Sequence, residues 1–506
     1  MSELTDLGKG LITNYVNLFN GRFISHLIGA IGSFLIIRIL QPEEYGALSV
    51  AMAFPTMLMV FGNLGINTAV TRYVSKFKDV NLDFAKSVIL SGMLFDFIFG
   101  SGLSILGYFI SPYVFSVIYD KPALVNFGRL ASIYSLTYWS FSSIFSGFLG
   151  FEMTNYNSRL WTAHYAFQTL FTVSLALAWE RIEGAIVGYI LGYAAATIYG
   201  LYILWNRKIL TGAAPKLSTL TEMLKYSLPL VVSSSVGNIF GIYTTSIINR
   251  FLTVVDLSNL NAASKIGFFF DTIFNPLSFA VQPLLSKIDR SDSIKMVKVV
   301  TELMKLNSLL ELPIIIAVIA LANPIIDLIA GPRYSSASLY LRLAMIGFLL
   351  GPLSGRSVLG TLLIFQGYTK FSMKVGILNN VTYAVLTTLL VLKYGASGYF
   401  VSSWLSWIPG YIISFVFVRS IINYRFPWKL VGQIALLSCI TLSPLFLIPQ
   451  SINVYGIIIS IPLFLVLVKL YIYFDIITKE EINVFLRGME NTNLRFMVKF
   501  LAKFLS

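Results

Sequence analysis

The sequence predicts an all-α polytopic membrane protein of about fourteen transmembrane helices, built as two parallel six-helix repeats followed by two further helices. Composition gives the first reason: 56% of the residues are hydrophobic and only 12% are charged, with a mean hydropathy of +0.78. In soluble domains about a quarter of the residues are charged. The apolar runs are each about 20 residues or longer, enough for a helix to cross a hydrocarbon core of about 30 Å. The third reason is an internal repeat.

Short motifs of the first half return in the second half at a nearly constant distance. IIRIL at residues 36–40 returns as INRFL at 248–252, an offset of 212 residues, and RLASI at 129–133 returns as RLAMI at 342–346, an offset of 213. A constant offset is what duplication of an ancestral half leaves behind. It maps the first predicted helix onto the seventh, so each repeat holds an even number of helices and both halves enter the membrane in the same direction.

The apolar segments define the predicted helices in chain order. They are 14–40, 46–71, 86–110, 127–150, 159–179, 182–204, 226–252, 257–285, 304–329, 338–365, 373–392, 397–420, 430–448 and 454–474. The first segment lacks a short apolar core followed by a cleavage site, so we expect a retained helix and not a signal peptide. In the second segment, Pro55 predicts a kink.

Basic residues predict the orientation in the membrane. The even-numbered connections between the predicted helices carry 19 lysines and arginines, and the odd-numbered connections carry 9. Since positive charge is retained on the cytoplasmic side, both termini should be cytoplasmic in a multi-pass protein of the cell membrane. The net charge of +14 then reflects topology and attraction to anionic membrane lipids, and a nucleic-acid partner is not expected.

The repeat also predicts the division of the chain into parts. These are an N-lobe of helices 1 to 6 (1–204), a cytoplasmic linker (205–225), a C-lobe of helices 7 to 12 (226–420), helices 13 and 14 (421–478) and a tail (479–506). In the tail, Arg495, Lys499 and Lys503 recur every four residues. This spacing predicts a basic amphipathic helix on the cytoplasmic leaflet, or else a solvated helical end.

Polar residues recur on one face of the first, second, seventh and eighth predicted helices. Such faces indicate either a water-filled cavity or helices joined by hydrogen bonds. Helices 7 and 8 are the repeat counterparts of helices 1 and 2, as a cavity shared by two lobes requires. The candidate binding residues on these faces are His26, Asn63, Asn67, Ser234, Asn238 and Asp271, with Lys265 beside the face of the eighth helix.

Two arginines inside predicted helices are further candidates. Arg22 lies about two turns inside the first helix, where a charge costs about 2.5–3.5 kcal/mol at a helix centre. It should therefore face water, an acid or an anionic ligand, unless its side chain reaches the cytoplasmic interface. Arg356 ends the stretch GPLSGR at 351–356, whose glycines and proline predict an interrupted helix bordering a cavity.

Acidic residues are scarce in the predicted helices. Asp96, Asp271 and Glu311 could each take up H⁺ or Na⁺ during transport, or neutralise a neighbouring basic residue.

Other chemistry is not expected. The lone Cys439 excludes an internal disulfide and a cysteine-rich metal site, and we expect it to be packed in the core. No phosphate-binding loop of the form GxxxxGK[ST] occurs, so direct nucleotide hydrolysis is not expected, nor is a metal or a cofactor.

The stretch IRILQPEEYGAL at 37–48, with GNLGI at 62–66 and Arg72-Tyr73, resembles the polysaccharide-export branch of the multidrug/oligosaccharidyl-lipid/polysaccharide transporter superfamily. GPRY at 331–334 is similar to the signature of that family's second half. The resemblance implies a flippase for lipid-linked oligosaccharides that works by alternating access between two six-helix lobes around a basic cavity.

In that family the headgroup of the cargo is a polyprenyl diphosphate, whose compact negative charge arginine and lysine recognise. The resemblance implies that Arg22 receives the diphosphate, helped by Arg72 and Lys265, while the sugars meet the asparagine and serine faces. It also implies membrane lipids, and possible polysaccharide-assembly proteins, as partners.

The residues alone leave two alternative functions open. A multidrug antiporter of the same superfamily would favour acidic residues in the cavity, but residues 14–37 contain Arg22 and His26 and no acid. A membrane polysaccharide polymerase or glycosyltransferase should show a long outer loop with catalytic residues, whereas the predicted outer connections are short. We therefore expect a transporter that is not an enzyme.

Overall fold

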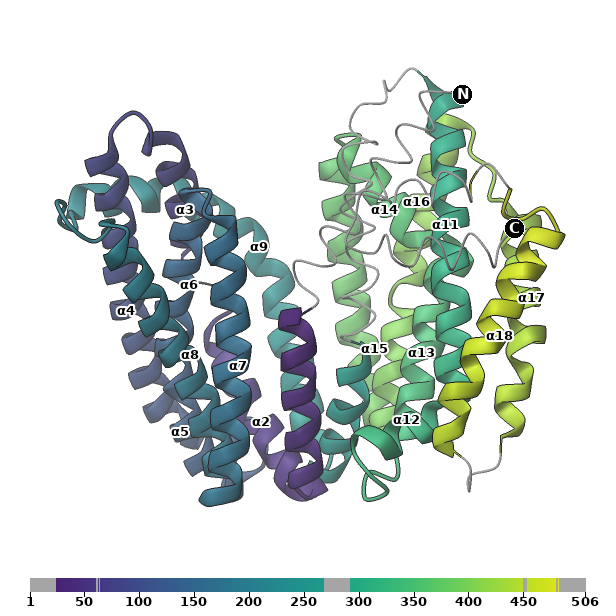
Figure 1. Cartoon of the computed structure of the whole chain (residues 1–506), viewed down its shortest axis with the longest axis horizontal. Helices are drawn as coiled ribbons and strands as arrows, with labels where there is room; N and C mark the ends of the chain where they lie inside the picture. The colour runs from purple at the N-terminus through teal and green to yellow at the C-terminus, as the bar shows by residue number, and fades with distance from the viewer. Residues whose placement is uncertain are drawn as a thin grey trace. The chain divides into compact units, whose positions relative to one another are not determined.

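The computed structural model describes residues 24–60, 62, 64–267, 292–448, 453–478 and 481, and the regular structure of these residues is helical throughout (Figure 1). Seven segments in them are long and apolar enough to cross a membrane. The longest, Thr369–Ile422, has 54 residues, far more than the roughly 20 that one crossing needs. The structure thus confirms an all-α, multi-span membrane protein, and the number of fourteen helices and the duplication stay predictions.

Contacts group the chain into two compact units. The first unit is Ile24–Asn261, and the described residues from Ala262 onward belong to the second unit. The helices of the first unit are Ile24–Ile39, α2 (Pro42–Leu58), α3 (Ile66–Phe77), α4 (Leu82–Tyr113), η1 (Val114–Ile118), η2 (Pro122–Leu124), α5 (Val125–Ser132), α6 (Tyr134–Gly150), α7 (Thr154–Ala178), α8 (Arg181–Asn206) and α9 (Leu217–Phe251). α9 belongs to the first unit, although most of this helix lies in the predicted second repeat, which begins at residue 226.

The second unit holds the rest of the described helices. A helix from residue 254 to residue 267 crosses the division between the units. Beyond it lie α11 (Ser293–Ala320), α12 (Ala322–Ile329), α13 (Ala337–Ser354), α14 (Arg356–Phe365), α15 (Thr369–Leu405), α16 (Ile408–Ile422), α17 (Trp428–Leu442), η3 (Ser443–Leu447) and α18 (Asn453–Tyr473). α15 is kinked at Gly395, whose φ is 59°.

Local sequence explains where helices begin. At the start of α2, Pro42 occupies the first turn, and the backbone N–H of Gln41 donates to Glu44 Oε2 at 2.8 Å. At the start of α4, Asn81 Oδ1 accepts from the backbone N–H of Phe84 at 3.0 Å. Each cap satisfies a backbone group that the first turn of a helix leaves without a partner.

The prediction of one helix over 46–71 is wrong. α2 ends at Leu58 and α3 begins at Ile66, and Pro55 lies inside α2 without ending it. Between the two helices, Leu64, with φ 54°, and Gly65, with φ 72°, adopt left-handed conformations that a continuous right-handed helix does not contain.

Small residues bring α7 and α8 together in the first unit. Gly184, Gly188 and Gly192 recur every four residues on one face of α8. A Cβ atom on Gly188 would lie 2.3 Å from Thr172 Cα on α7, and one on Gly192 would lie 2.6 Å from Gln168 Cα. The two backbones therefore touch, as small residues spaced by four allow in membranes.

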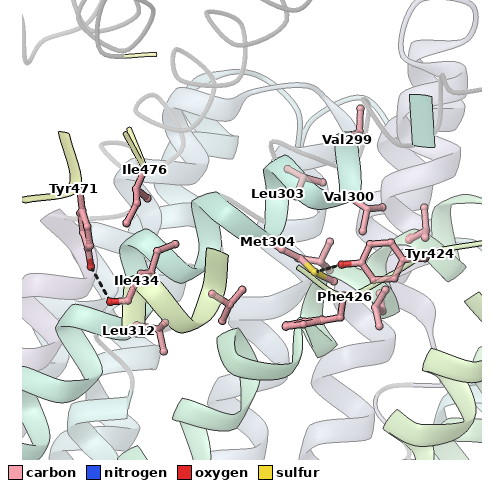
Figure 2. Packing of buried hydrophobic residues seen from close by; sticks show 14 of the residues in the cluster. Val299, Val300, Leu303, Met304, Leu312, Tyr424, Phe426, Ile434, Tyr471 and Ile476 are labelled. Atoms are coloured by element: carbon pink, nitrogen blue, oxygen red, sulfur yellow. Dashed lines mark hydrogen bonds between the residues drawn. The ribbon is translucent and has the colours of Figure 1, made fainter. Parts of the chain in front are cut away.

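The second unit has a core of buried apolar residues around α11 (Figure 2). Met304 and Tyr424 are fully buried there, and the Tyr424 hydroxyl donates to Met304 Sδ at 2.6 Å. Gly355, with φ 69°, ends α13 directly before α14, and a Cβ on it would lie 2.3 Å from Met304 Cε. The interrupted helix predicted from residues 351–356 is confirmed, and its left-handed conformation at Gly355 favours glycine.

The prediction that Cys439 is packed in the core is wrong. Its side chain is exposed on α17, although that helix is apolar enough to span a membrane. The opposite face of α17 supplies the buried residues, which include Ile434 and Ser438. Composition could not show which face of an apolar helix is packed.

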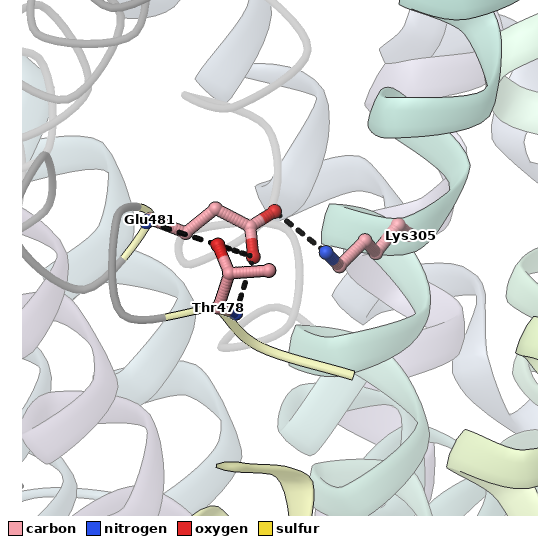
Figure 3. Close-up of polar contacts among 3 residues, drawn as sticks. All are labelled: Lys305, Thr478 and Glu481. Carbon is pink, nitrogen blue, oxygen red and sulfur yellow. Dashed lines mark hydrogen bonds and ion pairs between the residues drawn. The ribbon is translucent and has the colours of Figure 1, made fainter. Parts of the chain in front are cut away.

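The described chain ends at a capped turn that is tied to α11 (Figure 3). Thr478 donates to Glu481 Oε2 through its backbone N–H at 2.7 Å and through its hydroxyl at 3.0 Å, and Thr478 Oγ1 accepts from the backbone N–H of Glu481. Lys305 Nζ pairs with Glu481 Oε1 at 2.6 Å. The predicted amphipathic tail begins near this turn, and its residues beyond Glu481 lie outside the described residues.

Candidate functional site

Several predicted site residues lie outside the described residues. These are Arg22, Asn63 and Asp271. Ser234 lies on α9, but its side chain is also outside the description. The headgroup role predicted for Arg22 therefore stays a prediction.

The polar face of the first helix contacts α7. Ser25 Oγ and Thr162 Oγ1 share a hydrogen bond of 2.8 Å, and the His26 ring meets the Tyr165 ring edge-on with centroids 6.1 Å apart. A Cβ on Gly29 would lie 2.5 Å from Tyr165 Cδ1, so the helices are in close contact there. Of the two interpretations of this face, the contacts favour helix packing.

Asn67 and Asp96 each contact one of two consecutive serines of α6. Asn67 Nδ2 donates to Ser142 Oγ at 2.7 Å, and the Ser143 hydroxyl donates to Asp96 Oδ2. Asp96 is completely buried between α4 and α6. A carboxyl group is costly at such a place, so it marks either a functional proton or ion site or a polar joint between helices.

Arg72 differs from these residues because it is exposed. It lies at the C-terminal half of α3, and its Cζ atom stands 4.0 Å from the centroid of the Tyr226 ring on α9. The ring holds the guanidinium by a cation–π contact and leaves its donors available to an anion.

The polar face of α9 is open in its middle and closed at its end. Asn238 is exposed, and its Nδ2 donates to the Val60 carbonyl oxygen at 2.8 Å. A Cβ on Gly241 would meet nothing within 4 Å, whereas Asn249, two turns later, is only 5% exposed. Around Asn238 and Gly241, this described stretch of α9 leaves room for a ligand.

In the second unit, Arg356 begins α14 beside the break at Gly355. Its Cζ atom lies 4.1 Å from the centroid of the Trp407 ring, and it interacts electrostatically with Glu311 of α11. The structure thus joins a predicted binding arginine to a predicted ion-coupling acid. Lys265 is half-buried and lies on the helical segment 254–267.

Sequence reasoning missed a reciprocal cap between two helix ends in the first unit. Lys121 Nζ donates to the Leu252 carbonyl at 3.0 Å and also to the Asn249 carbonyl, at the end of α9. Arg250 Nη1 donates in return to the carbonyls of Val117 and Ile118 in η1, at 2.6 and 3.3 Å. Burial lowers the pKa of Lys121. No local pattern could reveal a cap between residues more than 120 positions apart.

These observations define the class: an all-α, multi-span membrane protein with polar and charged side chains held between its helices. The particular family follows from comparison. The model of the family described as "Polysaccharide biosynthesis protein" matches residues 11–289, more than half of the chain, and the chain belongs to that family. An uncharacterized membrane protein of Methanocaldococcus jannaschii is 23% identical over 395 residues, which cover 72% of this chain and 87% of that protein.

Solved structures of flippases and transporters share the fold. The lipid II flippase MurJ in an inward closed conformation superposes with a TM-score of 0.71 and 19% identity, covering 91% of this chain and 100% of MurJ. An inward-facing multidrug resistance transporter of the MATE family in the MOP superfamily gives 0.65 with 14% identity, covering 81% and 94%. A MOP superfamily transporter from Pyrococcus furiosus gives 0.54 with 14% identity, covering 82% and 96%. As expected, these similar proteins are transporters and not enzymes.

Proposed function

We propose that this protein is a flippase that moves a lipid-linked oligosaccharide, carried on a polyprenyl or dolichyl diphosphate, from the cytoplasmic to the outer leaflet by alternating access. Membership of the polysaccharide biosynthesis family is the observation that carries the proposal. The similarity to the lipid II flippase MurJ over its whole length supports a fold suited to such cargo. The lipid-linked oligosaccharide and the membrane lipids are then its partners.

Binding of the diphosphate needs basic side chains that do not already form ion pairs with acidic side chains of the protein. Arg72 is exposed and lies against Tyr226, and it forms no ion pair within the described part of the chain, so it can offer charge-assisted hydrogen bonds to phosphate oxygens. In the proposal, Arg22 receives the diphosphate, and Arg72 and Lys265 help to bind it. The open stretch of α9 around Asn238 would meet the sugars, because amide groups exchange hydrogen bonds with hydroxyls.

The test replaces Arg22 and Arg72 with alanine, singly. Each variant should insert and accumulate normally but deliver at least about tenfold less lipid-linked glycan to the outer leaflet, because a charged hydrogen-bond partner is worth about 1.5–3 kcal/mol. Arg419→Ala, an exposed arginine of α16 outside the proposed path, is the matched control. Wild-type delivery by both variants would refute the headgroup assignment.

A multidrug antiporter is the second candidate, favoured by the similarity to the MATE transporter and by the buried Asp96. Organic-cation efflux that survives Arg72→Ala but is lost in Asp96→Asn would identify it. Whether H⁺ or Na⁺ drives either function through Asp96, Asp271 or Glu311 is tested in vesicles with imposed gradients of each ion. Loss of the gradient dependence in one acid-to-amide variant would identify the coupling residue.

A further inference from the structure

Two arginines of the first unit converge on one tyrosine, where α7 begins and α8 ends. The Cζ atom of Arg207 lies 5.0 Å from the centroid of the Tyr156 ring, and that of Arg159 lies 5.5 Å from it. Arg207 Nη2 also donates to the Tyr156 hydroxyl. Both guanidinium groups thus gather around one ring, and because both side chains are exposed, they are free to turn toward one phosphate group and donate hydrogen bonds to it.

The charge of this pair is not neutralised within the described residues. The ion pairs formed there are Lys78–Glu152, Arg181–Glu44 and Lys305–Glu481, and none includes Arg159 or Arg207. Glu152, the acid nearest in sequence to Arg159, is thus held by Lys78 at 2.6 Å. Two neighbouring cations repel each other, so an anion between them lowers the free energy.

The start of α7 adds to the positive potential. Tyr156 lies in the first turn of this 25-residue helix, and the N-cap residue Met153 gives no side-chain cap to its backbone N–H groups. The first turn of a helix carries partial positive charge. This partial positive charge adds to the charge of the two arginines.

The position of Arg207 indicates that the anion belongs to a lipid. Arg207 directly follows α8, which is long and apolar enough to span a membrane. In the last turns of α8, Tyr202 and Trp205 are 61% and 62% exposed. Exposed aromatic residues at the end of a membrane helix are typical of the headgroup level, so the arginine pair lies beside lipid phosphates and not in bulk water.

We propose that Arg159, Arg207 and Tyr156 form a binding site for the phosphate of an anionic phospholipid. The phosphate lies between the two guanidinium groups, and the acyl chains run along the exposed face of α8 past Trp205. The predicted topology places the site in the cytoplasmic leaflet. The site shares no residue with the proposed cargo path, so it holds a resident lipid of the membrane.

The test measures lipid binding by the purified full-length protein with native mass spectrometry, using phosphatidylglycerol and phosphatidylcholine as probes. Arg159→Gln with Arg207→Gln should weaken phosphatidylglycerol binding at the tightest site about tenfold and leave phosphatidylcholine unchanged, because two charge-assisted contacts are lost. The matched control is Lys208→Gln with Lys225→Gln, which removes two exposed charges from the same predicted face. It should bind phosphatidylglycerol like the wild type.

Equal binding by all three proteins, or an equal loss in both double variants, would overturn the proposal, since the second result indicates general surface charge. Farnesyl diphosphate provides a further arm. If it displaces phosphatidylglycerol at far lower concentration than inorganic diphosphate does, the site belongs to a prenyl cargo and the proposal of a resident lipid fails. Arg159→Lys with Arg207→Lys keeps both charges should the glutamine variant not fold, and it should bind more weakly than wild type because lysine lacks the two-pronged donor geometry. No transport is measured, so failure here leaves the flippase proposal untouched.

Discussion

The carboxylate of Glu481 serves two partners at the end of the described chain. It caps the turn at Thr478 and pairs with Lys305 of α11 (Figure 3). Burial alone would raise the pKa of Glu481, but the hydrogen bonds from Lys305 and Thr478 outweigh it and hold the pKa below its ordinary value. The ionised form therefore stabilises the folded state.

This shift makes a prediction about pH. Glu481→Gln should lower the thermal midpoint of the purified protein at pH 7, and the difference from wild type should disappear as the pH falls through the lowered pKa of Glu481, where the wild-type carboxylate becomes protonated as well. Glu302→Gln, which removes an exposed carboxylate from α11, should show no such pH-dependent difference. A Glu481→Gln difference that persists unchanged into acid would contradict the assignment.

Single residues also separate the two interpretations that the sequence left open. The side chains of His26, Asn67 and Asp96 are used in contacts between helices of the first unit, whereas Arg72 and Asn238 are exposed. His26, Asn67 and Asn238 looked alike in sequence, because a polar residue on a helix face has the same spacing whether it meets a neighbouring helix or water. The neighbour decides, and the neighbour is distant in the chain.

Among the elements, the pairing of α7 with α8 depends on a row of glycines. The backbone of α8 at Gly188 touches the backbone of α7 at Thr172, so the contact leaves no room for a methyl group. Neither backbone can yield as the end of a flexible side chain would. Helix association here rests on close packing, since the lipid is as apolar as the helices.

Gly188→Ala should therefore destabilise the protein by about 1–3 kcal/mol, the usual cost of overpacking. Gly102→Ala on α4 is the matched control, because a Cβ there meets nothing within 4 Å. It should be neutral or stabilising by up to about 1 kcal/mol, since alanine is the better helix former. Thermal unfolding of the two variants in the same detergent checks this, and equal midpoints would show that α7 and α8 can separate freely.

For the whole molecule, the distribution of basic residues predicts which connections face the cytoplasm. In a Cys439→Ser background, Glu180→Cys should react with a membrane-impermeant thiol reagent added to intact cells, and Ala214→Cys should react only after the cells are opened. Both positions are exposed, so reactivity reports sidedness. The opposite pattern would reverse the predicted orientation of both termini.

The amino-acid sequence is enough to identify an all-α, multi-span membrane protein of the polysaccharide biosynthesis family, because hydropathy, run length and the motifs around residues 37–73 are properties of contiguous chain. It also located the helix break before Arg356, since glycine and proline act locally.

The contacts of individual residues became known from the three-dimensional structure. In the structure the predicted helix 46–71 is two helices, Cys439 is exposed, and Arg356 interacts with Glu311. Arg159 and Arg207 both lie against the Tyr156 ring. Each of these depends on which helix faces lie against each other. Complementary packing and hydrogen bonds between distant segments determine which faces meet. Hydropathy does not, because in an apolar chain nearly every helix face is apolar enough to be either buried or exposed to lipid.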